Sequence, residues 1–323
     1  MKRLRPYFFE LVALANLLIL AVFAYESIFL LGDILRVFGA LFLAIGVQAL
    51  IGIGVRALIG IVRGNRAYLR RIRRRAWMLD TLRLVFFNAL MIFTYGWLKL
   101  IVPLYRAANY DAALWELDRT LAFGVSPTIF LLDLFRGVAL RAIDWSYANI
   151  FYASMAVATM FFLSHPSRRI RIAFANGNVA MWIAGAWLYF AIPSIGPAYR
   201  FPDSWFPYAK ALHITQNLQI LLMSNFMAVL RAWNGLPHGP ISFALGIGAF
   251  PSLHVAFQTY VFLWMRRLWL SGQVLFAVFA FVIFIGSMIT GWHYLVDGLA
   301  GFAMAYVAYR IAIRSCRRLF SRA

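Results

Sequence analysis

Two short stretches of the sequence carry the residue types that nucleophilic and acid–base chemistry needs. Residues 248–254 are Gly-Ala-Phe-Pro-Ser-Leu-His, and residues 291–297 are Gly-Trp-His-Tyr-Leu-Val-Asp. Each stretch begins an apolar run, where ionisable residues are rare unless they serve a function. The pattern predicts one site built from His254, His293 and Asp297.

The spacing within the second stretch predicts how these groups work together. His293 and Asp297 are four residues apart, so on a helix they share one face. An unpaired aspartate at a membrane helix centre costs about 2.5–3.5 kcal/mol, which makes His293 its expected partner. A carboxylate bonded to one ring nitrogen fixes the tautomer and leaves the other nitrogen as a nucleophile. His254 then supplies a second acid–base group.

The composition indicates the kind of chain that holds this site. Hydrophobic residues make up 63% of the 323 residues and charged residues only 13%. Several apolar runs exceed the roughly 18 residues that indicate a spanning helix. We therefore predict an all-α integral membrane protein. Cys316 is the only cysteine, which excludes an intramolecular disulfide and a cysteine-based metal site.

The apolar runs predict about eight transmembrane helices. The first two, with a basic cytoplasmic loop, fill residues 1–83; a six-helix catalytic core fills 84–313; and 314–323 form a basic cytoplasmic tail. A turn is expected at Gly32-Asp33. The apolar pieces 127–132 and 218–230 are too short to span and predict interfacial or re-entrant helices on the outer side. The expected spans are 7–31, 37–62, 84–104, 147–163, 172–192, 251–265, 268–289 and 293–313.

The basic residues predict the orientation. A net charge of +20 in a soluble protein would suggest nucleic acid, but here it is better explained by cytoplasmic loops, so no nucleic-acid partner is expected. With both termini in the cytoplasm, the inside segments carry 21 basic residues and the outside segments nine. His254 and His293 then lie at the outer ends of the sixth and eighth helices. The expected location is a bacterial inner membrane, with the site on the periplasmic face.

The same topology predicts an anion pocket at the depth of the lipid headgroups. Two helix N-termini point at it, and their free N–H groups suit phosphate. Pro251 fits the first turn of the sixth helix, and the Ser252 hydroxyl can bond an oxyanion. Arg200 can clamp phosphate in two places, although an interfacial anchor explains it equally well.

The two motifs together resemble the type 2 phosphatidic acid phosphatase superfamily, and within it the inositol phosphorylceramide synthase branch. The resemblance covers about residues 84–313, and the stretch 117–124 with Pro127 is also similar to that branch. It implies that His293 attacks phosphorus to form a phosphohistidine and that Asp297 orients it. His254 would protonate the leaving alkoxide and then activate the acceptor. The family implies neither a metal nor a cofactor.

The sequence also departs from the phosphatase pattern. Leu253 replaces a glycine, and Ser287 stands where an arginine is expected. Lys99 and Arg106 have the Lys-x6-Arg spacing of a third motif, but no proline follows, and we interpret the spacing as chance. These departures favour a transferase over a simple phosphatase.

The predicted function is transfer of a phosphorylated headgroup, such as phosphoinositol, from a phospholipid donor to a lipid acceptor such as ceramide. A lipid phosphatase acting on phosphatidic acid or polyprenyl pyrophosphate is the alternative, and a lipid transporter or a scaffold belong to other classes. The sequence leaves the oligomeric state open. Four neighbouring residues receive structural interpretations: Asp118 and Arg119 as a local salt bridge, and Trp292 and Tyr294 as part of an aromatic belt.

Overall fold

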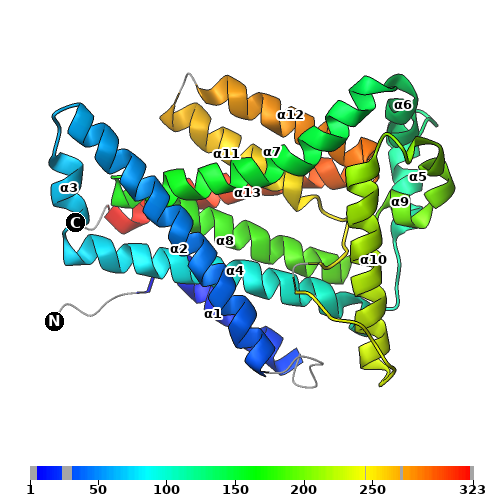
Figure 1. Ribbon diagram of the computed structural model, residues 1–323, viewed down its shortest axis with the longest axis horizontal. Coiled ribbons are helices and arrows are strands. Elements are labelled where there is room, and N and C mark those ends of the chain that lie inside the picture. The colour runs from blue at the N-terminus through cyan, green and yellow to red at the C-terminus, as the bar shows by residue number, and fades with distance from the viewer. Residues whose placement is uncertain (1–5, 24–30, 244, 270–271, 321–323) are drawn as a thin grey trace. The chain divides into compact units, whose positions relative to one another are not determined.

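The structure, a computed structural model, describes residues 6–23, 31–243, 245–269 and 272–320, and every regular element in them is helical. Figure 1 shows the order of the helices along the chain. Contacts divide the chain into two compact units. Unit 1 comprises Met1–Tyr95, Ser154–Ile183 and Val307–Ala323, and unit 2 comprises Gly96–Ala153 and Ala184–Tyr306.

Eight helices occur where long apolar runs predicted them, which confirms the all-helical membrane fold. Four are long and apolar enough to cross a membrane: Gly32–Val62, Arg75–Tyr105, Val138–Leu163 and Leu295–Ser315. Two further helices are apolar but shorter. The eight helices are α1 (Phe8–Phe23), α2 (Leu31–Val62), α4 (Arg75–Tyr105), α7 (Val138–Leu163), α8 (Arg168–Ala191), α11 (Leu253–Leu268), α12 (Gln273–Ile289) and α13 (Leu295–Phe320).

The start of α2 corrects the predicted turn at Gly32-Asp33. Both residues lie in the first turn of α2, where Asp33 pairs with Arg36 at 3.3 Å. A carboxylate is favourable at this position because the first turn has free N–H groups. The predicted end of the first helix, at residues 24–30, lies outside the described part of the chain.

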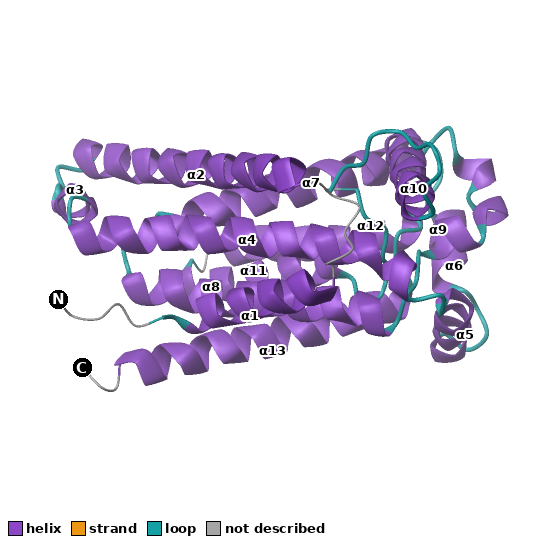
Figure 2. Cartoon of the chain, turned by 90° about the horizontal axis from the view of Figure 1, so that it is seen from below, coloured by secondary structure: helices purple, strands orange, loops and turns teal. Residues whose placement is uncertain are grey.

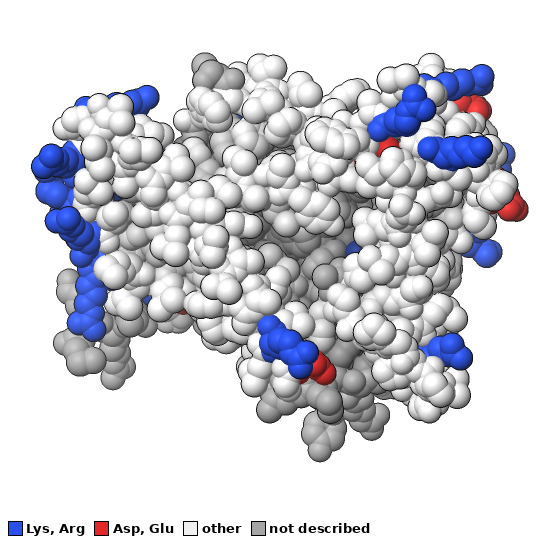
Figure 3. Space-filling model, in the orientation of Figure 1, with Lys and Arg blue, Asp and Glu red and all other residues white. Residues whose placement is uncertain are grey.

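Unit 1 combines an apolar surface with a strongly basic end. Helix α2 exposes a series of large apolar side chains, including Leu43, Leu50 and Leu58, which suits contact with lipid. The short helix α3 (Ala67–Ile72) and the adjoining ends of α2 and α4 carry the arginines (Figure 3). Those exposed there are Arg63, Arg66, Arg70, Arg71, Arg73, Arg74 and Arg75.

Unit 2 contains the shorter helices α5 (Asp111–Leu121), α6 (Pro127–Leu134), α9 (Pro197–Arg200) and α10 (His213–Trp233), with two 3-10 turns between α9 and α10. Helix α10 runs across the direction of α11 and α12 (Figures 1 and 2). Its first turn is capped by Asp144, which accepts from the N–H groups of Ile214 and Thr215 at 2.9 and 3.0 Å. Helix α10 is not among the candidate spans.

Candidate active site

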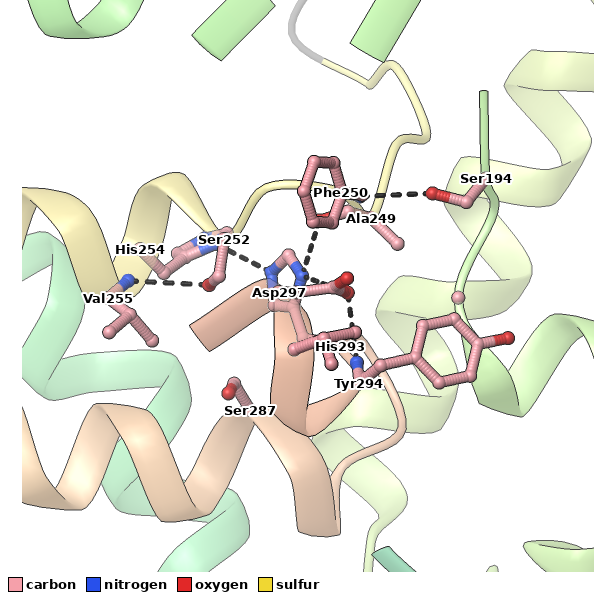
Figure 4. Close-up of polar contacts among 12 residues, drawn as sticks. Ser194, Ala249, Phe250, Ser252, His254, Val255, Ser287, His293, Tyr294 and Asp297 are labelled. Carbon is pink, nitrogen blue, oxygen red and sulfur yellow. Dashed lines mark hydrogen bonds and ion pairs between the residues drawn. The ribbon is translucent and has the colours of Figure 1, made fainter. Parts of the chain in front are cut away.

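His293 lies in the turn between α12 and α13, two residues before α13 begins (Figure 4). The predicted eighth helix, which began at His293, is therefore two residues too long at this end. The ring of His293 is 2% exposed, and its Nδ1 is 2.8 Å from the carbonyl oxygen of Ala249. Asp297 Oδ2 lies 3.4 Å from the same nitrogen.

These distances show what sets the tautomer of His293. A carbonyl oxygen only accepts, so Nδ1 must carry the proton and donate it to Ala249. Asp297 Oδ2 accepts the Tyr294 N–H at 2.9 Å and stands as the next neighbour of Nδ1. Asp297 is thus the second-nearest acceptor to Nδ1 and Ala249 the nearest, which refines the predicted pairing. The Nε2 lone pair remains available for attack.

The charge state of His293 follows from its surroundings. Burial, and then the positive charge of Lys99, lower the pKa of His293 to about 3, well below the ordinary value of 6.5. The ring is therefore neutral at physiological pH, with Nε2 unprotonated. A neutral imidazole is the form that can attack phosphorus.

His254 faces that lone pair from the first turn of α11. Its Nδ1 is 3.5 Å from His293 Nε2, within hydrogen-bond distance, so the two nitrogens are close enough to act on one group bound beside them. The ring of Phe151 lies 4.2 Å away between centroids, and that of Tyr147 5.7 Å, which fixes the orientation of His254. The predicted site thus has His254, His293 and Asp297 together.

Close backbone packing holds the two motifs against each other. The N–H of Ser252 donates to the carbonyl of Asp297 at 3.0 Å. A Cβ on Gly301 would lie 2.6 Å from the Ser252 carbonyl oxygen, so only glycine allows this approach. Gly185 of α8 makes room for Leu253, because a Cβ there would lie 2.5 Å from the leucine side chain.

Ser252 and Pro251 occupy positions slightly different from those predicted. Ser252 is the N-cap of α11, and its Oγ accepts the Val255 N–H at 3.4 Å. Pro251 precedes the cap and so is not in the first helical turn, which corrects the sequence interpretation. Ser252 is fully buried, and its O–H remains the group that can donate to an oxyanion.

Helix α5 anchors the start of α13 through Asp118, a role that the sequence did not reveal. Asp118 Oδ2 and Oδ1 accept the N–H groups of Leu295 and Val296 at 2.7 and 2.9 Å. The predicted salt bridge between Asp118 and Arg119 is wrong, because Arg119 pairs with Glu116 at 3.1 Å. Successive helical residues point in different directions, whereas residues three apart share a face.

Asp111, at the other end of α5, anchors a second loop. It accepts the N–H groups of Ile195 and Gly196 at 2.9 and 2.8 Å and the hydroxyl of Tyr294 at 2.8 Å. Tyr294 is fully buried, so its predicted place in an aromatic belt is wrong. Asp118 therefore holds the backbone that follows the histidine turn, and Asp111 holds a separate loop together with the Tyr294 side chain.

We predict that Asp118 makes the stability of the folded protein depend on pH. Burial raises its pKa to about 6, from 3.8. Between about pH 4 and 6 the folded protein binds this proton more tightly than the unfolded chain, so its contribution to stability is present below pH 4 and is lost as pH rises through 6. Asp118→Asn should remove that decline. Melting temperatures of both proteins from pH 4 to 8 measure the difference, and parallel curves would contradict the prediction.

Lys99 of α4 also belongs to the site, although the sequence interpretation dismissed it. Its charge acts on both His254 and His293. The site has room for its side chain because positions 246 and 248 are glycines; Cβ atoms there would lie 2.9 and 3.1 Å from it. The structure thus places the Lys99 side chain beside Gly246 and Gly248, while the chance origin of the Lys99–Arg106 spacing stays a prediction. Arg106 follows α4, with its guanidinium 5.8 Å from the ring of Phe190.

Removing the charge of Lys99 should weaken catalysis strongly. We expect Lys99→Met to lower kcat/KM about 10²-fold, since a fixed charge near developing negative charge contributes on that order. Lys210→Met is the matched control, because Lys210 is exposed and makes the same change of charge. Equal activity of the two variants would show that the charge of Lys99 does not contribute to catalysis.

Arg200, the other residue predicted to bind phosphate, lies in a helical turn that is bonded to Gly291 through the Ala198 N–H at 3.0 Å. It ends α9, is exposed, and lies with its guanidinium 5.8 Å from the ring of Phe201. In the described part of the chain, no hydrogen bond or ion pair connects it to the histidines. Among the same residues, no group of His, Cys, Asp and Glu side chains forms a metal-binding cluster.

The site thus combines the buried His293, the half-buried His254 that faces it and a nearby lysine in a helical membrane protein. The family model described as the PAP2 superfamily matches residues 112–311. Because this match covers more than half of the chain, the chain belongs to that superfamily. No curated protein and no solved structure matched the chain.

Proposed function

We propose that the chain transfers a phosphorylated headgroup, of the phosphoinositol type, from a phospholipid to a lipid acceptor such as ceramide. The superfamily supports phosphatase or phosphotransferase activity on lipids. The observation that carries the proposal is the 3.5 Å approach of His293 Nε2 to His254 Nδ1, beside the charge of Lys99. This geometry supplies a nucleophile, an acid and a cation for one phosphate.

The first half of the proposed reaction makes a phosphohistidine. Nε2 of His293 attacks phosphorus, forming the P–N bond while the P–O bond to the donor lipid breaks. His254, protonated beside the anionic phosphate, gives its proton to the departing alkoxide. The Nδ1 proton of His293 stays bonded to Ala249, and Asp297 offsets the positive charge that develops on the ring.

The second half reverses these roles. The acceptor hydroxyl attacks phosphorus and gives its proton to His254, while the P–N bond breaks and His293 returns to neutral. Arg200 and Ser252 are proposed to bind phosphate oxygens. A lipid phosphatase would use the same steps with water as the acceptor, and superfamily membership fits that alternative as well.

We further propose an orientation that suits these substrates. Both termini face the cytoplasm, as the basic segments suggest, and the site faces the outer side of a bacterial inner membrane. Phosphorylated headgroups and acceptor hydroxyls of lipids lie at that interface. The proposed domains are those given by the sequence, and the helix bounds are those of the structure.

An acceptor-dependence assay tests the function. The purified full chain is given phosphatidylinositol with or without ceramide or diacylglycerol, and separately phosphatidic acid or a polyprenyl pyrophosphate, with lipid products followed by mass. A phosphorylated product that needs both donor and acceptor supports the transferase. Free phosphate formed without an acceptor establishes the phosphatase instead. His238→Ala, in an exposed segment, is the control for His293→Ala.

A further inference from the structure

Unit 1 contains a buried arginine that pairs with no carboxylate in the described part of the chain. Arg171 of α8 is 1% exposed, and its Nη2 donates to Thr81 Oγ1 at 2.5 Å. Among the residues that the structure describes, its Nε and Nη1 have no hydrogen-bond partner. A buried guanidinium left in this state is costly, because burial removes water from a full positive charge.

The described side chains around Arg171 include a further hydrogen-bond donor, and the nearby carboxylate is already bonded to other groups. Its guanidinium lies 4.3 Å from the ring centroid of Trp77, whose own Nε1 is buried without a partner. Asp80, the acidic group whose charge acts on Arg171, already accepts from Arg168 Nε at 2.5 Å and from the Tyr7 hydroxyl at 2.8 Å.

Other cations surround the same place. The charges of Arg56, Arg71 and Arg171 all act on His165, in the turn between α7 and α8, and burial together with these charges lowers the pKa of His165 to about 4. Arg56 and Arg71 bond neutral groups: Arg56 reaches Ser164 Oγ at 2.9 Å, and Arg71 reaches the carbonyl oxygen of Pro166 at 2.8 Å. The cluster therefore has positive charge in excess.

We propose that Arg171 and Trp77 form an anion site, separate from the catalytic residues, that takes a phosphate group. A guanidinium presents two parallel N–H groups that match two phosphate oxygens, and the indole N–H is a further donor. A water molecule could accept a hydrogen bond there but would leave the charge uncompensated. Basic pockets between membrane helices are suited to phospholipid headgroups, and free phosphate has the same chemistry.

The test measures stability with and without the anion. The full chain in neutral detergent is heated alone, with phosphatidylglycerol, with phosphatidylcholine, with inorganic phosphate, or with chloride at equal ionic strength. We expect the melting temperature of the wild type to rise with phosphatidylglycerol or phosphate more than with their controls, because a ligand of the folded state stabilises it. The two arms separate a lipid headgroup from free phosphate.

Three variants decide whether Arg171 is responsible. Arg171→Met should reduce the anion-dependent rise at least by half, and without anion it should be no less stable than the wild type, since an uncompensated buried charge has been removed. Arg73→Met, an exposed arginine of the same basic end, should keep the rise. If Arg171→Met does not fold, Trp77→Phe keeps the ring but removes a donor, and a tenfold weaker apparent affinity is expected.

Two results would overturn the site. One is an anion-dependent rise in Arg171→Met, or in Trp77→Phe when that variant is needed, as large as in the wild type. The other is a wild-type chain stabilised no more by phosphatidylglycerol or phosphate than by phosphatidylcholine or chloride. Neither result depends on catalysis, so failure of the proposed function leaves this test intact.

Discussion

Replacing His293 with glutamine should lower kcat/KM by about 10⁴-fold or more, because the variant lacks the nucleophile on which both halves of the reaction depend. Glutamine is chosen because its amide can still donate to the carbonyl of Ala249, the 2.8 Å partner of Nδ1. The melting temperature should therefore change little while turnover is lost. Product formation from the donor and acceptor lipids, measured beside His238→Gln, gives the ratio.

The same residue should carry the reaction intermediate. A brief incubation of the wild type with labelled donor and no acceptor should place the phosphorylated headgroup on the peptide that contains His293. The P–N bond survives alkali and is cleaved by acid, which distinguishes it from a serine ester. Label on His254, or turnover that persists in His293→Gln, would contradict the assignment of the nucleophile.

Loss of His254 should cost less, and the cost should depend on the leaving group. General acid–base groups contribute about 10²–10⁴-fold, so His254→Gln should lower the rate with a lipid alkoxide by that amount. A p-nitrophenyl ester of the same phosphorylated headgroup needs no proton on its leaving group. The first half-reaction of the variant with that ester should approach the wild-type rate.

The release of p-nitrophenol in a single turnover measures this difference directly. Phe151 lies 4.2 Å from His254 between ring centroids, so Phe151→Leu serves as a control that disturbs packing without removing the acid. The control should slow both substrates by similar factors. An equal loss for both esters in His254→Gln would show that His254 positions the substrate rather than donating the proton.

The elements and part of the site could be predicted because their causes are local. Long apolar runs predicted the eight main helices, and the short spacing of His293 and Asp297 predicted their approach. The pairing of two motifs 39 residues apart was predicted from topology and from the family resemblance together. The helix boundaries were predicted less well: the sequence suggested a turn at Gly32-Asp33, but both residues lie in the first turn of α2.

The remaining parts depend on contacts between distant residues. Asp118 accepts hydrogen bonds from backbone N–H groups 177 and 178 positions away along the chain. A bond to backbone cannot be predicted from side-chain types, because every residue except proline has the same N–H group. Lys99 appeared irrelevant because no proline follows Arg106, yet the space left by Gly246 and Gly248 brings it to the site. Ala249 orients His293 through a carbonyl that every residue type possesses.

The anchoring of two loops by α5 predicts how sequences related to this one should vary. Asp111 and Asp118 bond the backbone of residues 195, 196, 295 and 296, so substitutions at positions 195, 295 and 296 leave those bonds intact. Gly196 is constrained for another reason, since its φ is +99° and a Cβ would lie 2.6 Å from the Trp292 carbonyl oxygen. In an alignment of related sequences, the two aspartates and Gly196 should therefore be constant, while the residue types at positions 195, 295 and 296 should vary. A related chain that retains His254 and His293 should therefore also retain α5, although that helix supplies no reacting group.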